Sequence, residues 1–326
     1  MARVEQAEIH ARFGAEIARR LEASVGSDDL LDVAARYHLA TGGKRLRALL
    51  PPWVCANLGG DPADALDLGV GFELLHNATL VHDDLQDGDT QRRGQPAVWA
   101  RCGAAQAINV GDALFFRGLE RIANAPRGGA FLPEAFTAMS AVIGGQALEF
   151  QLQLPPADPL HLTPRLASWE RMAGGKTAAL FAACIRAGAF AARRDDTGCA
   201  AAAAFGRRVG LLFQVQDDLL DLVGDKGRGQ RATDLAEGKI SFPVAWAVEH
   251  AAPAAVDRLL AVVRAPRAET TPAMVQDALD LLDQTGAIAA TIAWLRSEAA
   301  HAEADPMADS VPGFVERVLD PVRHVL

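Results

Sequence analysis

Residues 73–87 read ELLHNATLVHDDLQD, an apolar helical pattern that ends in the motif Asp-Asp-x-x-Asp. At about 100° per residue, Asp83, Asp84 and Asp87 fall on one face of the predicted helix. Three carboxylates on one face repel each other unless a cation joins them. Magnesium prefers carboxylate and phosphate oxygens, so the cluster predicts a metal site, with a solvated acidic helix end as the alternative.

The same motif recurs as Asp217, Asp218 and Asp221, with Gln214 one turn earlier on the carboxylate face. Each of the two identical motifs ends a long apolar segment, and a solvated acidic surface does not readily explain both. We therefore expect two helices on opposite walls of one cavity, where the six carboxylates hold Mg²⁺ ions and, through them, one diphosphate. The metal would neutralise the leaving group and orient it.

Basic residues lie near the first motif. Lys44, Arg45 and Arg47 follow Thr41-Gly42-Gly43 at an expected helix start, where free N–H groups favour anions. Arg92 and Arg93 follow the motif in a segment that Gly94 and Pro96 mark as a loop. Their planar guanidinium groups suit phosphate oxygens, although exposed arginines are commonly just solvated.

Other polar residues extend this basic set. Lys176 and Thr177 repeat the combination of glycines, a cation and a hydroxyl after Gly174-Gly175, at another expected helix start. Lys239 follows the second motif, and His76 projects from nearly the same face as Asp83. Near the carboxylates, His76 could donate a hydrogen bond to a diphosphate; a histidine in isolation would usually be structural.

The bulk composition predicts the fold class. Half of the 326 residues are apolar and 22% are charged, as in soluble globular proteins. Long helical segments alternate with short Pro/Gly breaks, and signals for strands are almost absent. We predict one all-α domain over residues 1–326, a bundle of about a dozen helices around a central active-site cavity.

Charge and cysteine usage exclude other classes. A net charge of −9 argues against a nucleic-acid partner, which would need a broad basic surface. The four cysteines lack Cys-x-x-Cys spacing, which favours buried, reduced thiols over a zinc or redox site. We see no signal peptide, and residues 178–192 are too short for a membrane span and read as a buried core helix. A cytoplasmic location fits.

Together these motifs resemble the trans-isoprenyl diphosphate synthases, also called the polyprenyl synthetase family, from about Gly42 to about Pro243. The matching pieces are Gly-Gly-Lys44-Arg45-Leu-Arg47, Glu73-Leu-Leu-His76, the first motif with Arg92-Arg93-Gly94, Gly145-Gln146-Ala-Leu-Glu149, Gly175-Lys176-Thr177, Phe213-Gln214 with the second motif, and Asp234 through Lys239. The resemblance implies the isoprenoid synthase type of all-α fold, a homodimer and magnesium bound by the six aspartates.

The resemblance also implies the reaction and the roles of the basic residues. Isopentenyl diphosphate is added head to tail to an allylic diphosphate (dimethylallyl, geranyl or farnesyl) in isoprenoid biosynthesis. Substrate-binding positions fall into two groups: Lys44, Arg47, His76 and Arg93, with Arg45 beside them, for isopentenyl diphosphate, and Arg92, Lys176, Thr177, Gln214 and Lys239 for the allylic diphosphate. Lys176 is also counted with the aspartates among the catalytic residues.

Some positions depart from the family pattern. Glu149 stands where aspartate is common, and residues 227–232 lack the usual lysine, for which Arg228 or Arg231 would substitute. Ala78, five residues before Asp83, is small where enzymes that stop early often place an aromatic ring. We therefore expect a twenty-carbon product, with longer chains possible, and consider Phe115 and Phe116 as residues that close the cavity.

Two alternatives remain at this point. A class I terpene cyclase ionises the same substrates, but it normally replaces the second motif and needs no pocket for isopentenyl diphosphate. A non-catalytic partner subunit of a synthase usually loses motif aspartates, whereas all six are present here.

Overall fold

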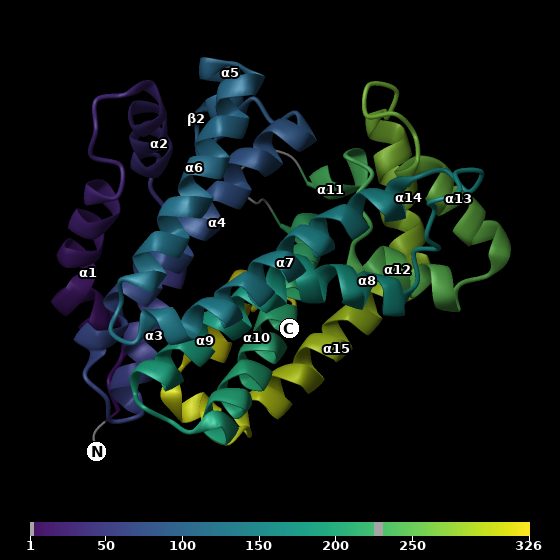
Figure 1. Ribbon diagram of the computed structural model, residues 1–326. Helices are drawn as coiled ribbons and strands as arrows, with labels where there is room; N and C mark the ends of the chain where they lie inside the picture. Colours follow the sequence, from purple (N-terminus) through teal and green to yellow (C-terminus); the bar gives the residue numbers. More distant parts are fainter. Residues whose placement is uncertain (1–2, 225–230) are drawn as a thin grey trace. The chain divides into compact units, whose positions relative to one another are not determined.

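The structure is a computed structural model that describes residues 3–224 and 231–326. Nearly all regular elements in this part of the chain are helices (Figure 1), which confirms the all-α prediction. The residues group into two compact units: Met1–Met139 with Ala182–Ala204 and Asp309–Pro312, and Ser140–Phe181 with Phe205–Ala308 and Gly313–Leu326. A single domain over the whole chain stays a prediction.

The first unit contains six of the α-helices in full. They are α1 (Gln6–Ala23), α2 (Leu30–Ala40), α3 (Leu46–Asn57), α4 (Leu66–Asp87), α5 (Val98–Cys102) and α6 (Ala104–Ala123), with the 3₁₀ turn η1 (Pro62–Ala65) before α4. Asp61 caps η1 by accepting a hydrogen bond from Ala63 N, as the Asp-Pro pair predicts. The strands β1 (Gln91–Arg92) and β2 (Gln95–Pro96) pair antiparallel after α4.

Helix α4 is the buried centre of the first unit. Leu68, Val70, Phe72 and Leu74 are fully buried although they point in different directions around the helix. A helix that is apolar all round belongs in a core. Glycines let its neighbours approach closely: a Cβ on Gly71 would lie 2.7 Å from the carbonyl oxygen of Gly118 on α6. The segment that carries the first motif is thus held rigidly from several sides.

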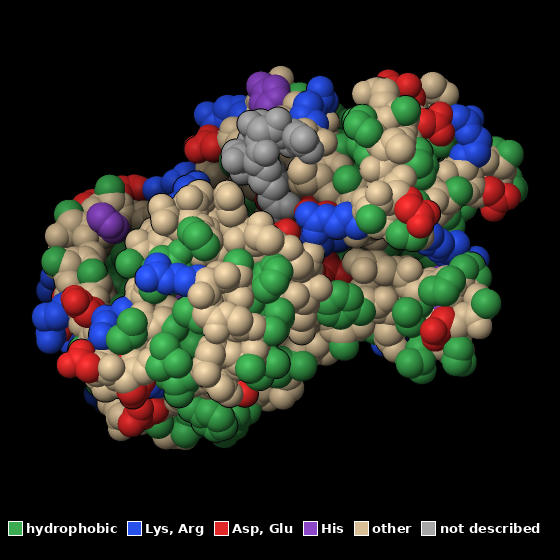
Figure 2. Space-filling view, turned by 90° about the horizontal axis from the view of Figure 1, so that it is seen from above, with side chains coloured by type: hydrophobic (Ala, Val, Ile, Leu, Met, Phe, Trp, Pro, Cys, Tyr) green, Lys and Arg blue, Asp and Glu red, His purple; other side chains and the backbone are tan. Residues whose placement is uncertain are grey.

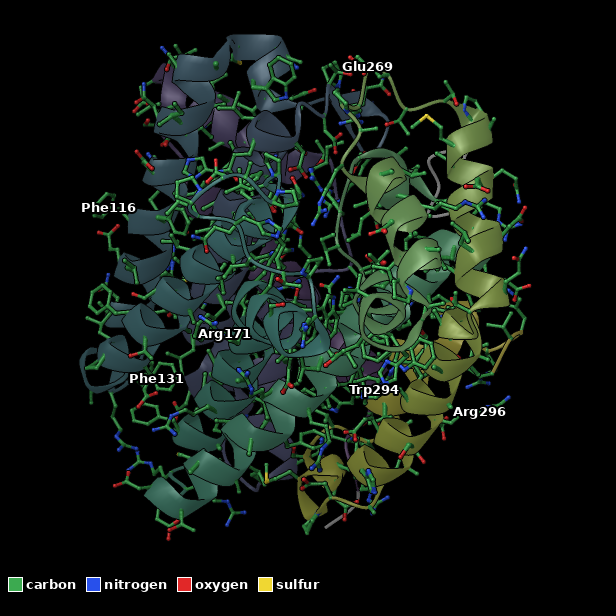
Figure 3. The ribbon with its side chains drawn as sticks, turned by 90° about the vertical axis from the view of Figure 1, so that its right-hand side faces the viewer. Phe116, Phe131, Arg171, Glu269, Trp294 and Arg296 are labelled. Atoms are coloured by element: carbon green, nitrogen blue, oxygen red, sulfur yellow. The ribbon has the colours of Figure 1, made fainter. Side chains whose placement is uncertain are left out.

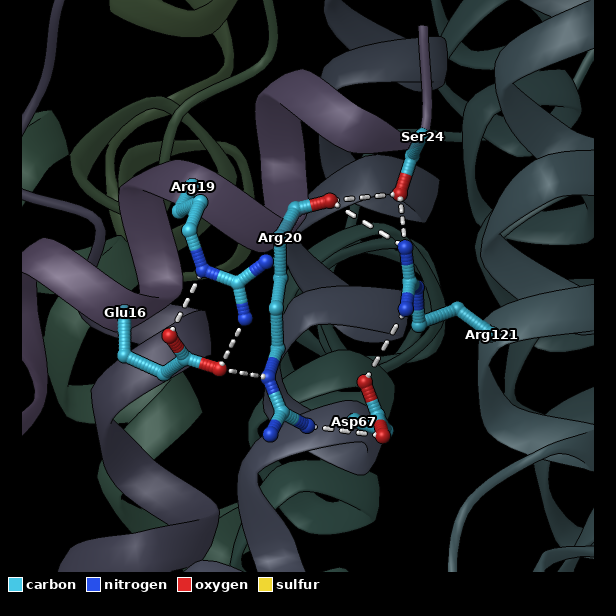
Figure 4. Close-up of polar contacts among 6 residues, drawn as sticks. All are labelled: Glu16, Arg19, Arg20, Ser24, Asp67 and Arg121. Atoms are coloured by element: carbon cyan, nitrogen blue, oxygen red, sulfur yellow. Dashed lines mark hydrogen bonds and ion pairs between the residues drawn. The ribbon is translucent and has the colours of Figure 1, made fainter. Parts of the chain in front are cut away.

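An ionic network ties three helices of this unit together (Figure 4). Asp67, in the first turn of α4, pairs with Arg20 of α1 at 2.7 Å and with Arg121 of α6 at 3.4 Å. Arg121 also donates to Ser24 Oγ at 2.9 Å. The network fixes the N-terminal end of α4, opposite the end that carries the aspartates.

The second unit contains the following complete elements: α8 (Leu166–Ala173), a π-helical turn η2 (Gly174–Ala178), α11 (Thr233–Ala236), α12 (Phe242–His250), α13 (Pro253–Val263), α14 (Pro272–Gln284), α15 (Ala287–Glu303), α16 (Phe314–Leu319) and the 3₁₀ turn η4 (Asp320–Val322). Three helices and one 3₁₀ turn contribute residues to both units: α7 (Gly128–Gln153), α9 (Ala179–Ala191), α10 (Asp196–Val223) and η3 (Pro306–Ser310).

Two predictions about buried segments are confirmed. Helix α9 spans the apolar segment predicted to be a core helix, and Phe181, Ile185 and Ala189 on it are fully buried. All four cysteines are free and three of them are buried; burial raises the pKa of Cys55 to about 12. No helix in residues 3–224 and 231–326 is long and apolar enough to cross a membrane.

Candidate functional site

The first motif lies in the last turns of α4, which ends at Gly88 in the left-handed conformation. Asp83 and Asp87 are half-buried, whereas Asp84 is only 1% exposed. Both oxygens of Asp84 accept hydrogen bonds from Arg92 Nε, at 2.7 and 2.9 Å. Burial raises the pKa of Asp84, and the Arg92 guanidinium opposes that shift. The three carboxylates therefore differ in their surroundings.

Arg92 reaches Asp84 because the chain turns back in a two-residue hairpin. Arg93 and Gly94 form its turn with φ values of 54° and 74°. Positive φ at both central residues is the signature of a type I′ turn, which matches the twist of paired strands. We expected only a loop here, since strands of two residues leave no alternating pattern in the sequence.

Arg93 projects from this turn to the glycine segment before α3. Its guanidinium donates to Gly42 O and lies 3.5 Å from Thr41 Oγ1. A Cβ on Gly43, which has a φ of 128°, would lie 2.8 Å from Arg93 Nη2. The segments around residues 42 and 93 therefore meet, as predicted for residues that share one ligand.

Arg45, Arg47 and Arg93 form a cationic cluster around His76 in the first unit, and Lys44 is not among the charges that act on His76 or Arg93. Burial lowers the pKa of His76 well below its ordinary value, and the charges of Arg47, Arg92 and Arg93 lower it further. Burial likewise lowers the pKa of Arg93, helped by Arg92 and Arg45. Cations held this close together favour an anionic ligand.

Glu73 contacts both α3 and Arg45 of this cluster, and we did not predict a role for it. Its side chain is buried, accepts a hydrogen bond from Ala48 N in the first turn of α3 at 3.3 Å, and lies 3.9 Å from Arg45 Nη1. Arg45 itself precedes α3 in the left-handed conformation, while Lys44 beside it is exposed. The spacing Glu73-x-x-His76 on one helix was the available signal.

A buried histidine beside the cluster makes stability depend on pH. Burial and the charges of Arg92 and Arg93 lower the pKa of His38 from 6.5 to about 3. Below pH 6.5 the unfolded chain therefore binds a proton that the folded chain does not, so stability falls as the pH drops toward 3. At pH 5 this loss is about 2 kcal/mol.

We predict that His38→Gln weakens the decrease in unfolding midpoint between pH 7.5 and pH 5, as measured by circular dichroism in urea. His324→Gln, which alters an exposed histidine, is the control and should keep the decrease of the unmodified chain. An equal pH dependence in all three proteins would contradict the assignment to His38.

The second motif lies in the last turns of α10, and two of its aspartates are hydrogen-bonded to other segments. Asp218 accepts hydrogen bonds from Gln214 Nε2 at 2.9 Å and from Phe242 N at 2.7 Å. Asp221 accepts from Thr233 Oγ1 at 2.7 Å and from Asp234 N at 3.0 Å, which fixes the start of α11. Asp217 is the half-buried member of the motif. Identical spacing thus does not give identical environments.

Lys176 and Thr177 lie on the π-helical turn η2, not at the helix start that we expected. Turns of this kind occur mainly as single insertions in α-helices, often at functional sites. Thr177 Oγ1 donates to Gln214 Oε1 at 2.6 Å, so Thr177, Gln214 and Asp218 form one hydrogen-bonded chain. Lys176 Nζ lies 2.5 Å from Glu149 Oε2 on α7.

Glycines explain why the turn meets α7 at this point. A Cβ on Gly145 would lie 2.1 Å from Lys176 N, and one on Gly175 would lie 2.6 Å from Ala141 O. The two backbones therefore touch, and only glycine fits at the contact. This gives a physical reason for the motif Gly145-Gln146-Ala-Leu-Glu149 next to Gly175-Lys176-Thr177.

The remaining predicted residues lie after the second motif. Lys239 pairs with Glu237 at 3.0 Å, and Arg267 pairs with the same carboxylate. Arg231 donates to Leu222 O at 2.6 Å, so its guanidinium binds the end of α10 in this structure. Arg228 lies outside the described residues.

The motif aspartates provide oxygen ligands of the kind that magnesium binds. Carboxylate oxygens suit this hard cation, and Asp83, Asp87 and Asp217 are the motif members that are not buried. No group of three or more His, Cys, Asp or Glu side chains among residues 3–224 and 231–326 is arranged to hold a metal ion. Mg²⁺ needs no such cage, because it is commonly held by one or two carboxylates with waters and substrate phosphates. The residues present fit that mode of binding.

Comparison with known proteins identifies the family. Residues 28–282 match the polyprenyl synthetase family. The chain belongs to this family. It is 37% identical to the geranylgeranyl diphosphate synthase of Mycobacterium tuberculosis, over 74% of this chain and 71% of that protein. Identity to the short chain isoprenyl diphosphate synthase of Methanothermobacter thermautotrophicus is 32%, over 78% and 77% of the two chains.

Solved structures agree with this family assignment. The crystal structure of geranylgeranyl pyrophosphate synthetase from Pyrococcus horikoshii has a TM-score of 0.85 at 28% identity, covering 96% of this chain and 98% of that one. Polyprenyl synthetase from Streptomyces coelicolor gives 0.81 at 28% identity, over 99% and 100% of the chains. Membership of the polyprenyl synthetases confirms the prediction of a trans-prenyltransferase and disfavours the cyclase and the non-catalytic subunit.

Proposed function

We propose that this polyprenyl synthetase condenses isopentenyl diphosphate head to tail with an allylic diphosphate in isoprenoid biosynthesis. The cationic cluster of Arg45, Arg47 and Arg93, with His76 beside it, carries this proposal. It provides an anion site beside the first motif, which a cyclase acting on one allylic diphosphate would not need. The relatives named as geranylgeranyl and short chain isoprenyl diphosphate synthases support the same reaction.

The aspartates of both motifs would hold Mg²⁺, with Asp83, Asp87 and Asp217 as first candidates because they are not buried. Magnesium, when bound, would neutralise the diphosphate as the allylic C–O bond breaks. Asp84, Asp218 and Asp221 are already hydrogen-bonded within the protein, and they would orient the neighbouring segments.

Lys176, Thr177, Gln214, Arg92 and Lys239 would bind the allylic diphosphate and stabilise its charge as it departs. Lys44, Arg45, Arg47, His76 and Arg93 would hold isopentenyl diphosphate so that its double bond attacks the allylic cation. A proton is then lost, for which released diphosphate is the available base. Catalysis of this kind is positioning and charge stabilisation, and it requires no nucleophilic side chain.

We propose a twenty-carbon product from primers of five to fifteen carbons. Ala78 on α4 is small and fully buried, so no aromatic side chain at this position stops the growing prenyl chain. Phe116 is 73% exposed and projects away from α6 (Figure 3), so it cannot close a cavity within this chain, and our hypothesis for that residue is wrong. Phe115 is half-buried, with its ring 5.7 Å from that of His82, and remains a candidate.

The proposal extends to assembly and location. Ile108 and Phe116 on α6 are large apolar side chains exposed on the surface, 48% and 73%, which supports a homodimer whose mass light scattering can measure. On the face drawn in Figure 2, basic side chains are interspersed with acidic and apolar ones. We place the protein in the cytoplasm, with no nucleic acid among its partners.

Product analysis tests the proposed function. The protein is incubated with isopentenyl diphosphate, Mg²⁺ and dimethylallyl, geranyl or farnesyl diphosphate in turn, and products are identified by mass. We expect geranylgeranyl diphosphate to dominate with each primer. Absence of elongation with all three primers would exclude the function, whereas a longer product would correct only the chain length.

A further inference from the structure

An aromatic pocket in the second unit lies outside the candidate site. Its volume is about 460 Å³, within the range of small-molecule sites. None of the sequence-predicted site residues lines it. Trp169 on α8, Trp246 on α12 and Trp294 on α15 do, and these are three of the five tryptophans in the chain.

The aromatic rings that line the pocket form two groups of contacts. Phe242 lies between two of the tryptophans, with ring centroids 5.1 Å from Trp169 and 5.3 Å from Trp294. Trp246 stacks on His250 at 4.4 Å. Trp169 and Phe242 are buried, while Trp246 and Trp294 are half-buried and so keep ring surface accessible.

The carboxylates that line the pocket are not matched by lining Lys or Arg side chains. Glu170 and Glu298 line it, and neither Lys nor Arg does. Among residues 3–224 and 231–326, Glu298 makes only long ionic contacts, 3.7 Å to Arg208 and 3.5 Å to His301. Glu170 is exposed, and its carboxylate makes no hydrogen bond or ion pair with any described residue. His250 Nδ1 lies 2.9 Å from Trp246 O and must donate to this carbonyl, which leaves Nε2 as an acceptor in the neutral ring.

These features match one chemical class of ligand. Aromatic faces attract a cation through their quadrupole, and water is easily removed from an alkylated ammonium group. The carboxylates add attraction for positive charge and repel diphosphates, the ligands of the candidate site. We propose that this pocket binds a small organic cation, an alkylammonium ion with an apolar body.

Binding to the full chain can be measured by calorimetry with choline chloride as the probe. The uncharged probe 3,3-dimethylbutanol has the same shape, with a carbon atom in place of the charged nitrogen. Inorganic pyrophosphate with Mg²⁺ is present in excess, so that the candidate site is occupied. We expect saturable binding of one cation per chain and affinity at least about tenfold weaker for the alcohol.

Three variants locate the cation. Trp294→Leu removes one half-buried ring, and Glu170→Gln changes an exposed carboxylate that folding does not need; each should weaken binding at least about threefold. Glu303→Gln, which neutralises an exposed acid on the same helix as Trp294, should leave affinity unchanged. Equal affinity for the two probes, or unchanged binding in both Trp294→Leu and Glu170→Gln, would overturn the proposal and leave the proposed function intact.

Discussion

Replacement of Gly145 by alanine is expected to lower the free energy of unfolding by about 3 kcal/mol or more. The added Cβ would lie 2.1 Å from Lys176 N and 2.7 Å from Gly175 C. Both are backbone atoms, so no side-chain rotation relieves the clash, and α7 must separate from the π-helical turn. Because Glu149 and Lys176 meet across this contact, prenyl transfer should fall as well.

The neighbouring glycine provides a matched control. Gly144 lies on the same helix, is exposed, and has nothing within 4 Å of its Cβ position. Gly144→Ala should therefore be neutral or stabilise the protein by up to about 1 kcal/mol, because alanine favours helix. Urea unfolding followed by circular dichroism measures both variants. Similar stabilities for the two would contradict the backbone contact.

The second large effect is expected at Asp83. Asp83→Asn keeps the shape of the side chain but removes a charge that we assign to magnesium binding. Loss of one such stabilising group should reduce kcat by about 100- to 1000-fold. The concentration of Mg²⁺ needed for half-maximal rate should also rise, which a purely structural role would not produce.

Asp112→Asn is the control for this variant. Asp112 is an exposed acid on α6, outside both motifs, and its replacement makes the same change in net charge. Its rate and magnesium requirement should match those of the unmodified chain. Full activity of Asp83→Asn at unchanged magnesium concentration would remove Asp83 from the metal site.

Elements that depend only on neighbouring residues in the sequence could be predicted best. The helix that carries Glu73, His76 and Asp83 is predicted well because its apolar pattern is continuous and its end is marked by Gly88. The gathering of Arg47, Arg93 and His76 was predicted from the family resemblance, and the structure brings these three residues together. Their roles toward substrates remain predictions.

Features that depend on distant segments could not be predicted. The π-helical turn at Lys176 reflects close contact with Gly145, which no local pattern at residues 174–178 records. The partners of Asp218 and Asp221 come from Phe242 and Thr233, well beyond the motif. The aromatic pocket likewise assembles tryptophans that are far apart in the chain.

The ratio of diphosphate released to isopentenyl units incorporated tests most directly whether the protein is a prenyltransferase. Labelled isopentenyl diphosphate and farnesyl diphosphate are supplied with Mg²⁺, and both quantities are measured over time. We predict one diphosphate released for each isopentenyl unit incorporated, and no release when isopentenyl diphosphate is omitted. Diphosphate release from farnesyl diphosphate alone, with formation of a hydrocarbon, would show a cyclase and contradict prenyl transfer.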